Sequence, residues 1–253
     1  MLKVRIIPSL LIKNSLLVKG KQFKKDRIIG SIISAIKVFN SRKVDEIIVL
    51  DTEATNLNQE PNYNLIEQIS NHCFIPLTVG GGISKIEHVS KLLKSGADKI
   101  SINTSCVENT NLIQDIINKY GSQILVSSID VKKINGKYTC YTNSGLVDTK
   151  KNVTEVISIL ENIGVGEILI TSIDRDGMMS GYDLELIKLV SHNVSIPIIC
   201  QGGCGSYQDM LDAINSGADA IGASSIFNFT EQTPFQAKEF LKNNKINVRF
   251  WLI

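Results

Sequence analysis

The 253-residue sequence lacks the features that mark several classes of protein. Its 27 basic and 25 acidic residues leave a net charge of only +2 with histidine neutral, so no overall field draws the chain to nucleic acid or to a membrane surface. The only three histidines are His72, His88 and His192, and their scattered positions offer no metal-ligand spacing. We therefore expect no metal and no other cofactor.

Cysteine is also scarce, and its pattern argues against a disulfide framework. The chain has an odd number of widely spaced cysteines: Cys73, Cys106, Cys140, Cys200 and Cys204. Cys200 and Cys204 have no second pair of ligands to complete a zinc site. The first twelve residues are apolar but carry Lys3, Arg5 and Pro8, which predicts a buried strand rather than a signal or membrane segment. These features predict a cytoplasmic protein with reduced thiols.

The hydrophobic pattern predicts alternating strands and helices. Hydrophobic residues make up 43% of the chain and charged residues 21%, as in an ordinary globular protein. Eight short runs are apolar on both faces, as buried parallel strands are: 4–10, 46–51, 75–79, 99–103, 124–130, 167–172, 196–200 and 218–223. Amphipathic helices are predicted between them: 31–38, 64–71, 86–94, 111–119, 153–163, 184–190, 207–215 and 234–242. Eight strand–helix units predict a single (β/α)₈ TIM barrel domain over residues 1–253.

The sequence repeats itself at a constant offset of 121 residues. The Ile-Pro at 75–76, the Gly-Gly at 81–82 and the Ser-Gly-Ala-Asp at 95–98 recur at 196–197, 202–203 and 216–219. Glu46-Ile47 and Glu167-Ile168 share the same offset. A constant offset of half the chain length predicts two similar half-barrels.

One insertion interrupts the regular pattern after Asp130. Residues 131–134 and 137–141 flank Asn135-Gly136, a dipeptide that favours a type I′ hairpin turn. We expect a small β-ribbon at the carboxyl ends of the strands, where barrel active sites lie.

Polar and glycine-rich loops follow several predicted strands. Glycines let backbone N–H groups approach an anion, and hydroxyl and amide side chains complete a neutral phosphate site. The candidate residues are Gly82, Asn103 and Thr104 in the first half and Gly203, Ser224 and Ser225 in the second. One such group in each half predicts two phosphate sites and an elongated substrate. The alternative is that these glycines serve only to form tight turns.

Asp130 ends the fifth predicted strand and is the candidate general acid or base. Its counterpart in the first half-barrel is Leu11, which cannot share acid and base roles. The loop of residues 171–177 adds Thr171, Asp176 and Gly177. These residues could orient a ligand or form an acidic loop tied together by Arg175.

Charged residues also lie at the opposite ends of four strands: Arg5, Glu46, Lys99 and Glu167. Inward-facing residues of a barrel meet in layers, so two acids and two bases could form a ring across the barrel floor. Buried charges are costly unless paired. Spacing alone does not decide between two roles for this ring. It could simply close the barrel floor, or it could form a gate that admits a small molecule.

Together these residues resemble the HisF family, the cyclase subunits of imidazole glycerol phosphate synthase. The resemblance covers nearly the whole chain and is carried by TVGGG at 78–82 and by residues 5–8, 18–20, 96–103, 166–169, 171–177, 180–183 and 248–249. It implies a lyase-type synthase subunit in a heterodimer with a HisH-like glutaminase bound at the N-terminal face. Ammonia would pass the charged gate and cross the barrel to a phosphorylated substrate at the mouth. The resemblance also gives the phosphate sites and implies that Lys19 assists turnover.

The chain departs from the family pattern at position 11. The resemblance implies two catalytic aspartates, but Leu11 replaces one of them, Ser9 replaces a common cysteine, and residues 26–32 lack the usual Gly-Asp-Pro. Leu11-Ile12 is similar to a paralogous branch implied to supply ammonia for acetamidino groups on surface sugars. The alternatives are an authentic cyclase of histidine biosynthesis, a non-catalytic activator of the glutaminase, and the related sugar isomerase barrel of the same pathway. The cyclase would convert PRFAR and ammonia to imidazole glycerol phosphate and AICAR.

Overall fold

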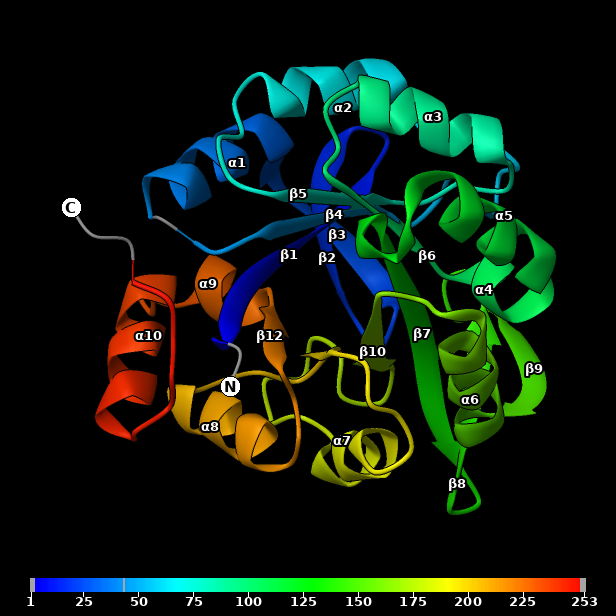
Figure 1. Ribbon diagram of the computed structural model, residues 1–253. Coiled ribbons are helices and arrows are strands. Elements are labelled where there is room, and N and C mark those ends of the chain that lie inside the picture. Colours follow the sequence, from blue (N-terminus) through cyan, green and yellow to red (C-terminus); the bar gives the residue numbers. More distant parts are fainter. Residues whose placement is uncertain (1–2, 43, 251–253) are drawn as a thin grey trace.

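Eight parallel strands close into a barrel in the computed structural model, which describes residues 3–42 and 44–250. These strands are β1 (Arg5–Lys13), β4 (Ile47–Asp51), β5 (Leu77–Gly80), β6 (Lys99–Ile102), β7 (Leu125–Ile134), β10 (Glu167–Ser172), β11 (Ile198–Gln201) and β12 (Ala220–Ala223). Closure comes from β10, which pairs with β7 on one side and β11 on the other. Helices surround the strands (Figure 1). The predicted (β/α)₈ barrel is confirmed for the described residues; residues 1–2, 43 and 251–253 of the predicted 1–253 unit lie outside them.

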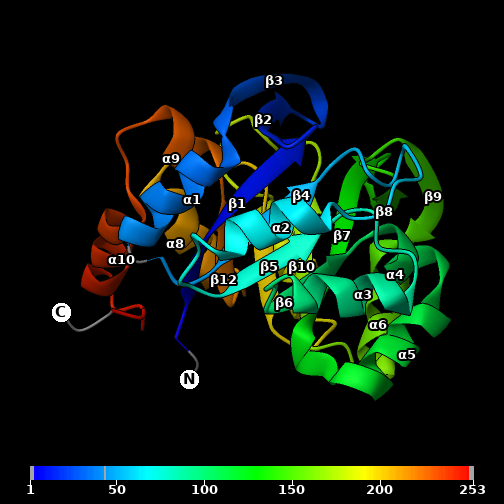
Figure 2. The same ribbon diagram turned by 90° about the horizontal axis from the view of Figure 1, so that it is seen from above.

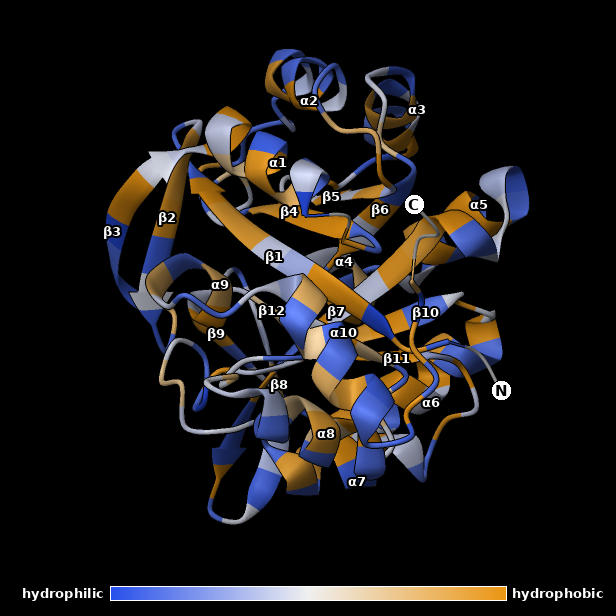
Figure 3. Cartoon of the chain, turned by 90° about the vertical axis from the view of Figure 1, so that its left-hand side faces the viewer, coloured by the Kyte–Doolittle hydropathy of each residue, from blue (hydrophilic) through white to orange (hydrophobic). Residues whose placement is uncertain are grey.

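The helices bury one apolar stripe against the barrel and leave the other face polar (Figure 3). They are α1 (Ile32–Ser41), α2 (Tyr63–Ser70), α3 (Ile86–Lys94), α4 (Thr104–Glu108), α5 (Thr110–Tyr120), α6 (Val153–Ile163), α7 (Leu184–Ser191), α8 (Tyr207–Asn215), α9 (Ser225–Phe229) and α10 (Pro234–Asn243), with a 3₁₀ turn, η1 (Ser122–Ile124). Capping side chains start several of them, among them Asn62 on α2 and Ser206 on α8. The bounds of α3, α6 and α8 are those predicted from periodicity, whereas the short α4 and α9 were not predicted. Within the described residues, no helix has the length and apolar character that crossing a bilayer requires.

The half-barrel repeat is confirmed element by element. The bounds of α7, α8, α9, β11 and β12 are those of α2, α3, α4, β5 and β6 shifted by 121 residues. Individual bonds repeat as well. Asp98 accepts a hydrogen bond from the backbone N–H of Leu77 at 2.8 Å, and Asp219 accepts one from Ile198 at 2.9 Å. The two halves therefore share their local geometry as well as their sequence pattern.

The predicted ribbon after Asp130 is present and larger than expected. Strand β7 continues past Asp130 to Ile134 and turns through Asn135 and Gly136, whose φ angles of 49° and 79° fit the predicted type I′ turn. It then pairs with β8 (Lys137–Thr142), which pairs with β9 (Val147–Asn152). The third strand was not predicted because residues 147–152 are polar and partly exposed.

A second antiparallel hairpin, in a region where the sequence predicted no strand, extends β1. It consists of β2 (Leu16–Lys21) and β3 (Lys24–Ser31), and it projects beyond the end of β1 (Figure 2). The tight turn from β1 into β2 uses Asn14-Ser15, and the turn between β2 and β3 uses Gln22-Phe23; all four residues have positive φ. Turns of this kind usually carry glycine, and the absence of glycine hid the hairpin.

The barrel interior is layered because alternate residues of each strand point inward. The charged floor is followed by an aliphatic layer of Ile7, Ile48, Val126, Leu169, Ile199 and Ala220, with Leu50 packed against it. Further along the strands, smaller and polar side chains such as Ser101 and Ser128 line a cavity at the carboxyl ends. The barrel is thus charged at one end, apolar in the middle and polar at the other.

A buried ion pair attaches the last helix to the start of the barrel. Lys238 of α10 lies 2.7 Å from Asp45, and both side chains are almost fully buried. The other oxygen of Asp45 accepts the backbone N–H of Ile6 at 2.9 Å. This pair links the two ends of the chain.

We expect Lys238→Met to lower the free energy of unfolding by about 3 kcal/mol, because the change leaves the Asp45 carboxylate buried without its cation. Urea denaturation would measure the loss. The exposed Lys188 of α7 supplies the control, and Lys188→Met should change stability little. Equal losses for the two variants would contradict this role for the pair.

Candidate functional site

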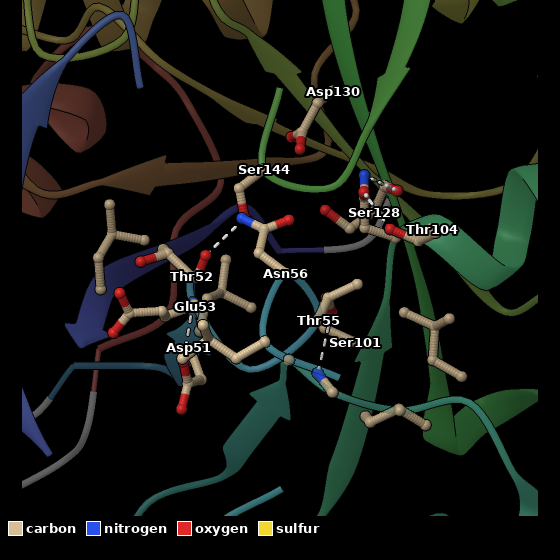
Figure 4. A pocket seen from close by; sticks show the side chains of 18 of the residues that line it. Asp51, Thr52, Glu53, Thr55, Asn56, Ser101, Thr104, Ser128, Asp130 and Ser144 are labelled. Atoms are coloured by element: carbon tan, nitrogen blue, oxygen red, sulfur yellow. Dashed lines mark hydrogen bonds between the residues drawn. The ribbon is translucent and has the colours of Figure 1, made fainter. Parts of the chain in front are cut away.

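A cavity of about 640 Å³ opens at the carboxyl ends of the strands. Side chains from the barrel strands, from the β4–α2 loop and from the loop around Ser144 line it (Figure 4). Ser144 donates a hydrogen bond to the backbone carbonyl of Thr52 at 2.6 Å, which joins the two loops across the rim. We call this space the mouth cavity.

Asp130 points into the mouth cavity from β7 (Figure 4). Only 9% of the residue is exposed. Burial, together with the charge of Asp176, raises the pKa of the Asp130 carboxyl to about 7, although a hydrogen bond with Thr171 opposes the rise. A carboxyl group with this pKa can both give and accept a proton near neutral pH.

Lys19 and Asp176 meet beside Asp130. The Lys19 ammonium lies 3.6 Å from Asp176, and both side chains are almost completely buried. Lys19 comes from the β2–β3 hairpin, which is fixed to the β10–α7 loop because the N–H of Gln22 donates to the carbonyl of Asp176 at 2.8 Å. The unpredicted hairpin is therefore the element that places Lys19 at the site.

Leu11 lies in the wall of the same cavity. It is paired with Leu50 on the neighbouring strand β4, so two leucines stand side by side above the aliphatic layer. Leu11 thus places an apolar side chain in the mouth at the position where the resemblance implies an aspartate.

The two predicted phosphate sites lie in different surroundings. Gly82, Asn103 and Thr104 line the mouth cavity together with Thr171. The second group, Gly177, Gly203, Ser224 and Ser225, lines a separate cavity of about 10 Å³ with Lys19 and Asp176. Sequence reasoning expected equivalent sites, whereas the structure makes the first spacious and the second very small.

The four charged residues at the strand starts form a ring. Arg5 contacts Glu46 at 2.9 Å and also bonds Glu167, and Lys99 lies 3.2 Å from Glu46 and 3.1 Å from Glu167. The glutamate side chains are 3% and 8% exposed, whereas those of Arg5 and Lys99 are 24% and 25% exposed. Burial would lower the pKa of Arg5, but its bonds and attraction to the two glutamates outweigh burial and raise it. Thr78 donates to Glu46 at 2.7 Å and extends the ring inward.

Sequence reasoning missed the β4–α2 loop. Thr52, Glu53, Thr55 and Asn56 line the mouth cavity opposite Asp130 (Figure 4). The Asp51 carboxylate accepts the backbone N–H groups of Glu53 and Ala54 at 2.9 and 3.0 Å, and so shapes the turn. An Asp at the carboxyl end of a predicted strand was the available signal. Among the described residues, no group of three His, Cys, Asp or Glu side chains could hold a metal ion.

Comparison with known proteins identifies the family. The model of the histidine biosynthesis protein family matches residues 5–233. The chain belongs to this family. It is 43% identical to a putative imidazole glycerol phosphate synthase subunit hisF2 of Campylobacter jejuni, over 98% of this chain and 99% of that protein. The corresponding hisF2 protein of Pseudomonas aeruginosa is 42% identical over 90% and 92%, and the subunit HisF of Chlorobium phaeovibrioides is 41% identical over 98% and 100%.

HisF and hisF2 relatives thus occur at nearly equal identity, so overall similarity favours neither. The distinction rests on individual residues of this HisF-family barrel, Leu11 foremost among them. The predicted resemblance itself is confirmed.

We expect stability to depend on pH through Asp130. Its pKa is raised from 3.8 to about 7 in the folded state, so the folded state keeps this proton across that window and wild-type stability falls as pH rises through it. Asp130→Asn removes the charge, and near pH 8 it should raise the free energy of unfolding by on the order of 2 kcal/mol. The gain should vanish near pH 4. Denaturation at both pH values measures it, with the exposed Asp115→Asn as control; a gain independent of pH would contradict the assignment.

Proposed function

We propose that this chain receives ammonia from a HisH-like glutaminase subunit at the N-terminal face and delivers it through the barrel to a phosphorylated substrate at the mouth. The observation that carries the proposal is the charged floor ring, which lies at the opposite end of the strands from the mouth cavity. A barrel that needed only closure could use aliphatic side chains, which avoid the cost of burying charge.

The partial exposure of the two cations in the ring supports a role as a gate. The two glutamates are buried and hold Arg5 and Lys99, whose side chains are about a quarter exposed at the floor. A partner bound at the N-terminal face can reach these cations. Moving one of them aside opens the ring while the other keeps the glutamates paired.

The aliphatic layer above the ring suits neutral ammonia. An ammonium ion would lose its hydration there at a cost of several kcal/mol, whereas neutral ammonia is small and uncharged. Thr78 and Ser101 supply polar atoms along the way, and the Ser101 hydroxyl is buried without a partner. The layer therefore selects the species that can act as a nucleophile.

At the mouth, we assign Asp130 the acid–base role and Lys19 a supporting one. We assign a phosphate to the second cradle, formed by Gly177, Gly203 and Ser224–Ser225 beside Lys19, because its glycines have positive φ and let backbone groups approach an anion. The phosphate would enter after the hairpin moves, since Gly177 packs against the carbonyl of Gly20 on that hairpin. Leu11 cannot transfer a proton. It favours the paralogous role, in which ammonia passes onward to an enzyme that builds acetamidino groups on surface sugars.

The alternative is an authentic imidazole glycerol phosphate synthase subunit that converts PRFAR. Its support is the retention of Asp130, Lys19 and the floor ring. A non-catalytic activator of the glutaminase would need none of the residues at the mouth.

A cyclase assay separates the two roles. With PRFAR and an ammonium salt, we expect turnover at least about 10²-fold below that of a HisF cyclase, because one acid–base group is missing. Leu11→Asp should raise the rate, and Leu11→Asn, which has similar size but no proton to give, should not. Wild-type turnover equal to that of a HisF cyclase would establish the alternative.

The floor can be tested in a reconstituted system that contains the glutaminase, this chain and the sugar-modifying enzyme. Lys99→Met breaks two contacts of the ring and leaves it unable to close behind the ammonia that it admits. Ammonia then escapes at the floor, so product formed from glutamine should fall severalfold while product formed from ammonium chloride stays unchanged. Lys94→Met, an exposed position on α3, is the control. Undiminished product from glutamine in Lys99→Met would exclude this path.

A further inference from the structure

Exposed hydrophobic side chains gather around the mouth cavity. Of the eleven large hydrophobic residues that are exposed within the described ranges, seven lie on segments at the carboxyl ends of the strands. They are Leu16, Ile28, Leu57, Leu146, Val147, Met178 and Phe229. The other four are spread over three helices and the α2–β5 loop. Single exposed hydrophobic residues are ordinary, but a group around one opening is typical of an interaction site.

We call this surface the mouth rim and define it by the β4–α2 loop, the β8–β9 turn, the β10–α7 loop and the β2–β3 hairpin. Two of its segments are joined by a hydrogen bond, because Ser144 of the β8–β9 turn donates to the carbonyl of Thr52 in the β4–α2 loop (Figure 4). Leu146 and Leu57 follow these residues on the two segments, and both line the opening of the mouth cavity.

The hairpin is attached to the other two segments. A Cβ on Gly145 would lie 2.9 Å from the ring of Phe23, so the hairpin tip packs closely against the β8–β9 turn. The side-chain amide of Gln22 donates to the carbonyl of Asp174 at 2.9 Å, on the loop that carries Met178. The mouth rim is therefore a preformed surface, and a partner that binds it loses little conformational entropy in ordering it.

The hairpin also gives the mouth rim a positive charge. Lys21, Lys24 and Lys25 are exposed, and in the part of the chain that the structure describes none of the three forms an ion pair. On the neighbouring ribbon, by contrast, Lys133 lies 2.6 Å from Glu185. Unpaired cations beside exposed hydrophobic side chains complement a partner surface that carries carboxylates, and such charges steer association.

The position of the mouth rim indicates which protein would cover it. In the proposed function the glutaminase occupies the opposite, N-terminal face, and ammonia leaves the barrel at the mouth. Ammonia that enters water is protonated and lost as a nucleophile, whereas a covered mouth excludes water and prevents this leak. The macromolecule that gains most from contact with the mouth rim is therefore the one that consumes the ammonia.

We propose that the mouth rim docks the ammonia-accepting enzyme, through an apolar face of that enzyme bordered by carboxylates that meet the hairpin lysines. This inference rests on the proposed function, from which it takes the identity of the partner, and it adds where and by what chemistry that partner binds. Docking seals the mouth, so that ammonia passes from one protein to the other without entering bulk water.

Calorimetric titration tests the apolar part of this surface. The purified sugar-modifying enzyme should bind the complex of this chain with the glutaminase. Leu146→Ser, at a residue 74% exposed, and Leu57→Ser should each weaken this binding about tenfold. Ile159→Ser is the matched control, because Ile159 is also half exposed but lies on α6, away from the mouth rim; it should leave the affinity unchanged. All three variants should still bind the glutaminase, which shows that they are folded.

The charged part is tested by association kinetics. Lys24→Glu combined with Lys25→Glu should slow association severalfold at low salt and much less at high salt, because salt screens exposed charges. Lys188→Glu, at an exposed position on α7, should leave the rate unchanged.

Two results would overturn the proposal. One is the absence of binding, or binding that neither leucine variant weakens. The other is a dimer of this chain alone that Leu146→Ser disrupts in sedimentation velocity, which would make a second copy the occupant of the mouth rim. These measurements consume no glutamine, so they are independent of ammonia transfer. Delivery of ammonia without docking would refute this inference alone, and docking without delivery would refute the proposed function.

Discussion

The pairing of β7 with β10 closes the barrel, and every other feature of the site depends on that closure. Glu167 and Thr171 lie on β10 in register with Val126 and Asp130 on β7. Because alternate residues of a closed sheet share one interior, this register fixes two levels at once. It brings Glu167 to the level of the floor ring and sets Thr171 beside the carboxyl of Asp130.

The two half-barrels share a frame and differ in what the frame carries. Helix and strand bounds repeat at 121 residues, and so do the bonds of Asp98 and Asp219. The loops that extend this frame differ between the two halves. The β2–β3 hairpin places Lys19 beside Asp176 of the second half, whereas the β4–α2 loop covers Gly82 in the first half. The asymmetry of the mouth therefore arises from loops inserted on a symmetric scaffold, as barrel enzymes commonly vary their chemistry.

Charge is organised by depth along the barrel axis. The floor pairs its acids with Arg5 and Lys99, the middle excludes ions, and the mouth carries an excess of carboxylates. Burial and the charge of Asp176 raise the pKa of Asp130 to about 7. Lys19 lies 3.6 Å from Asp176 and faces the second cavity with it.

The sequence alone determined the strands, the helices and the repeat, because hydrophobic periodicity and the spacing of glycine pairs are local properties of the chain. It also placed Arg5, Glu46, Lys99 and Glu167 at the starts of strands. Closing the strands into a barrel then brings these four residues together at one end. The sequence did not predict the β2–β3 hairpin, because the turns before and within the hairpin use Asn, Ser, Gln and Phe. Glycine at these positions would have indicated tight turns. Only the tertiary structure decided which of Gly82 and Gly203 lies in the open cavity. Gly82 is hydrogen-bonded to Thr55, which lies 27 residues away along the chain. Three-dimensional packing brings such partners together, so a local sequence pattern does not predict them.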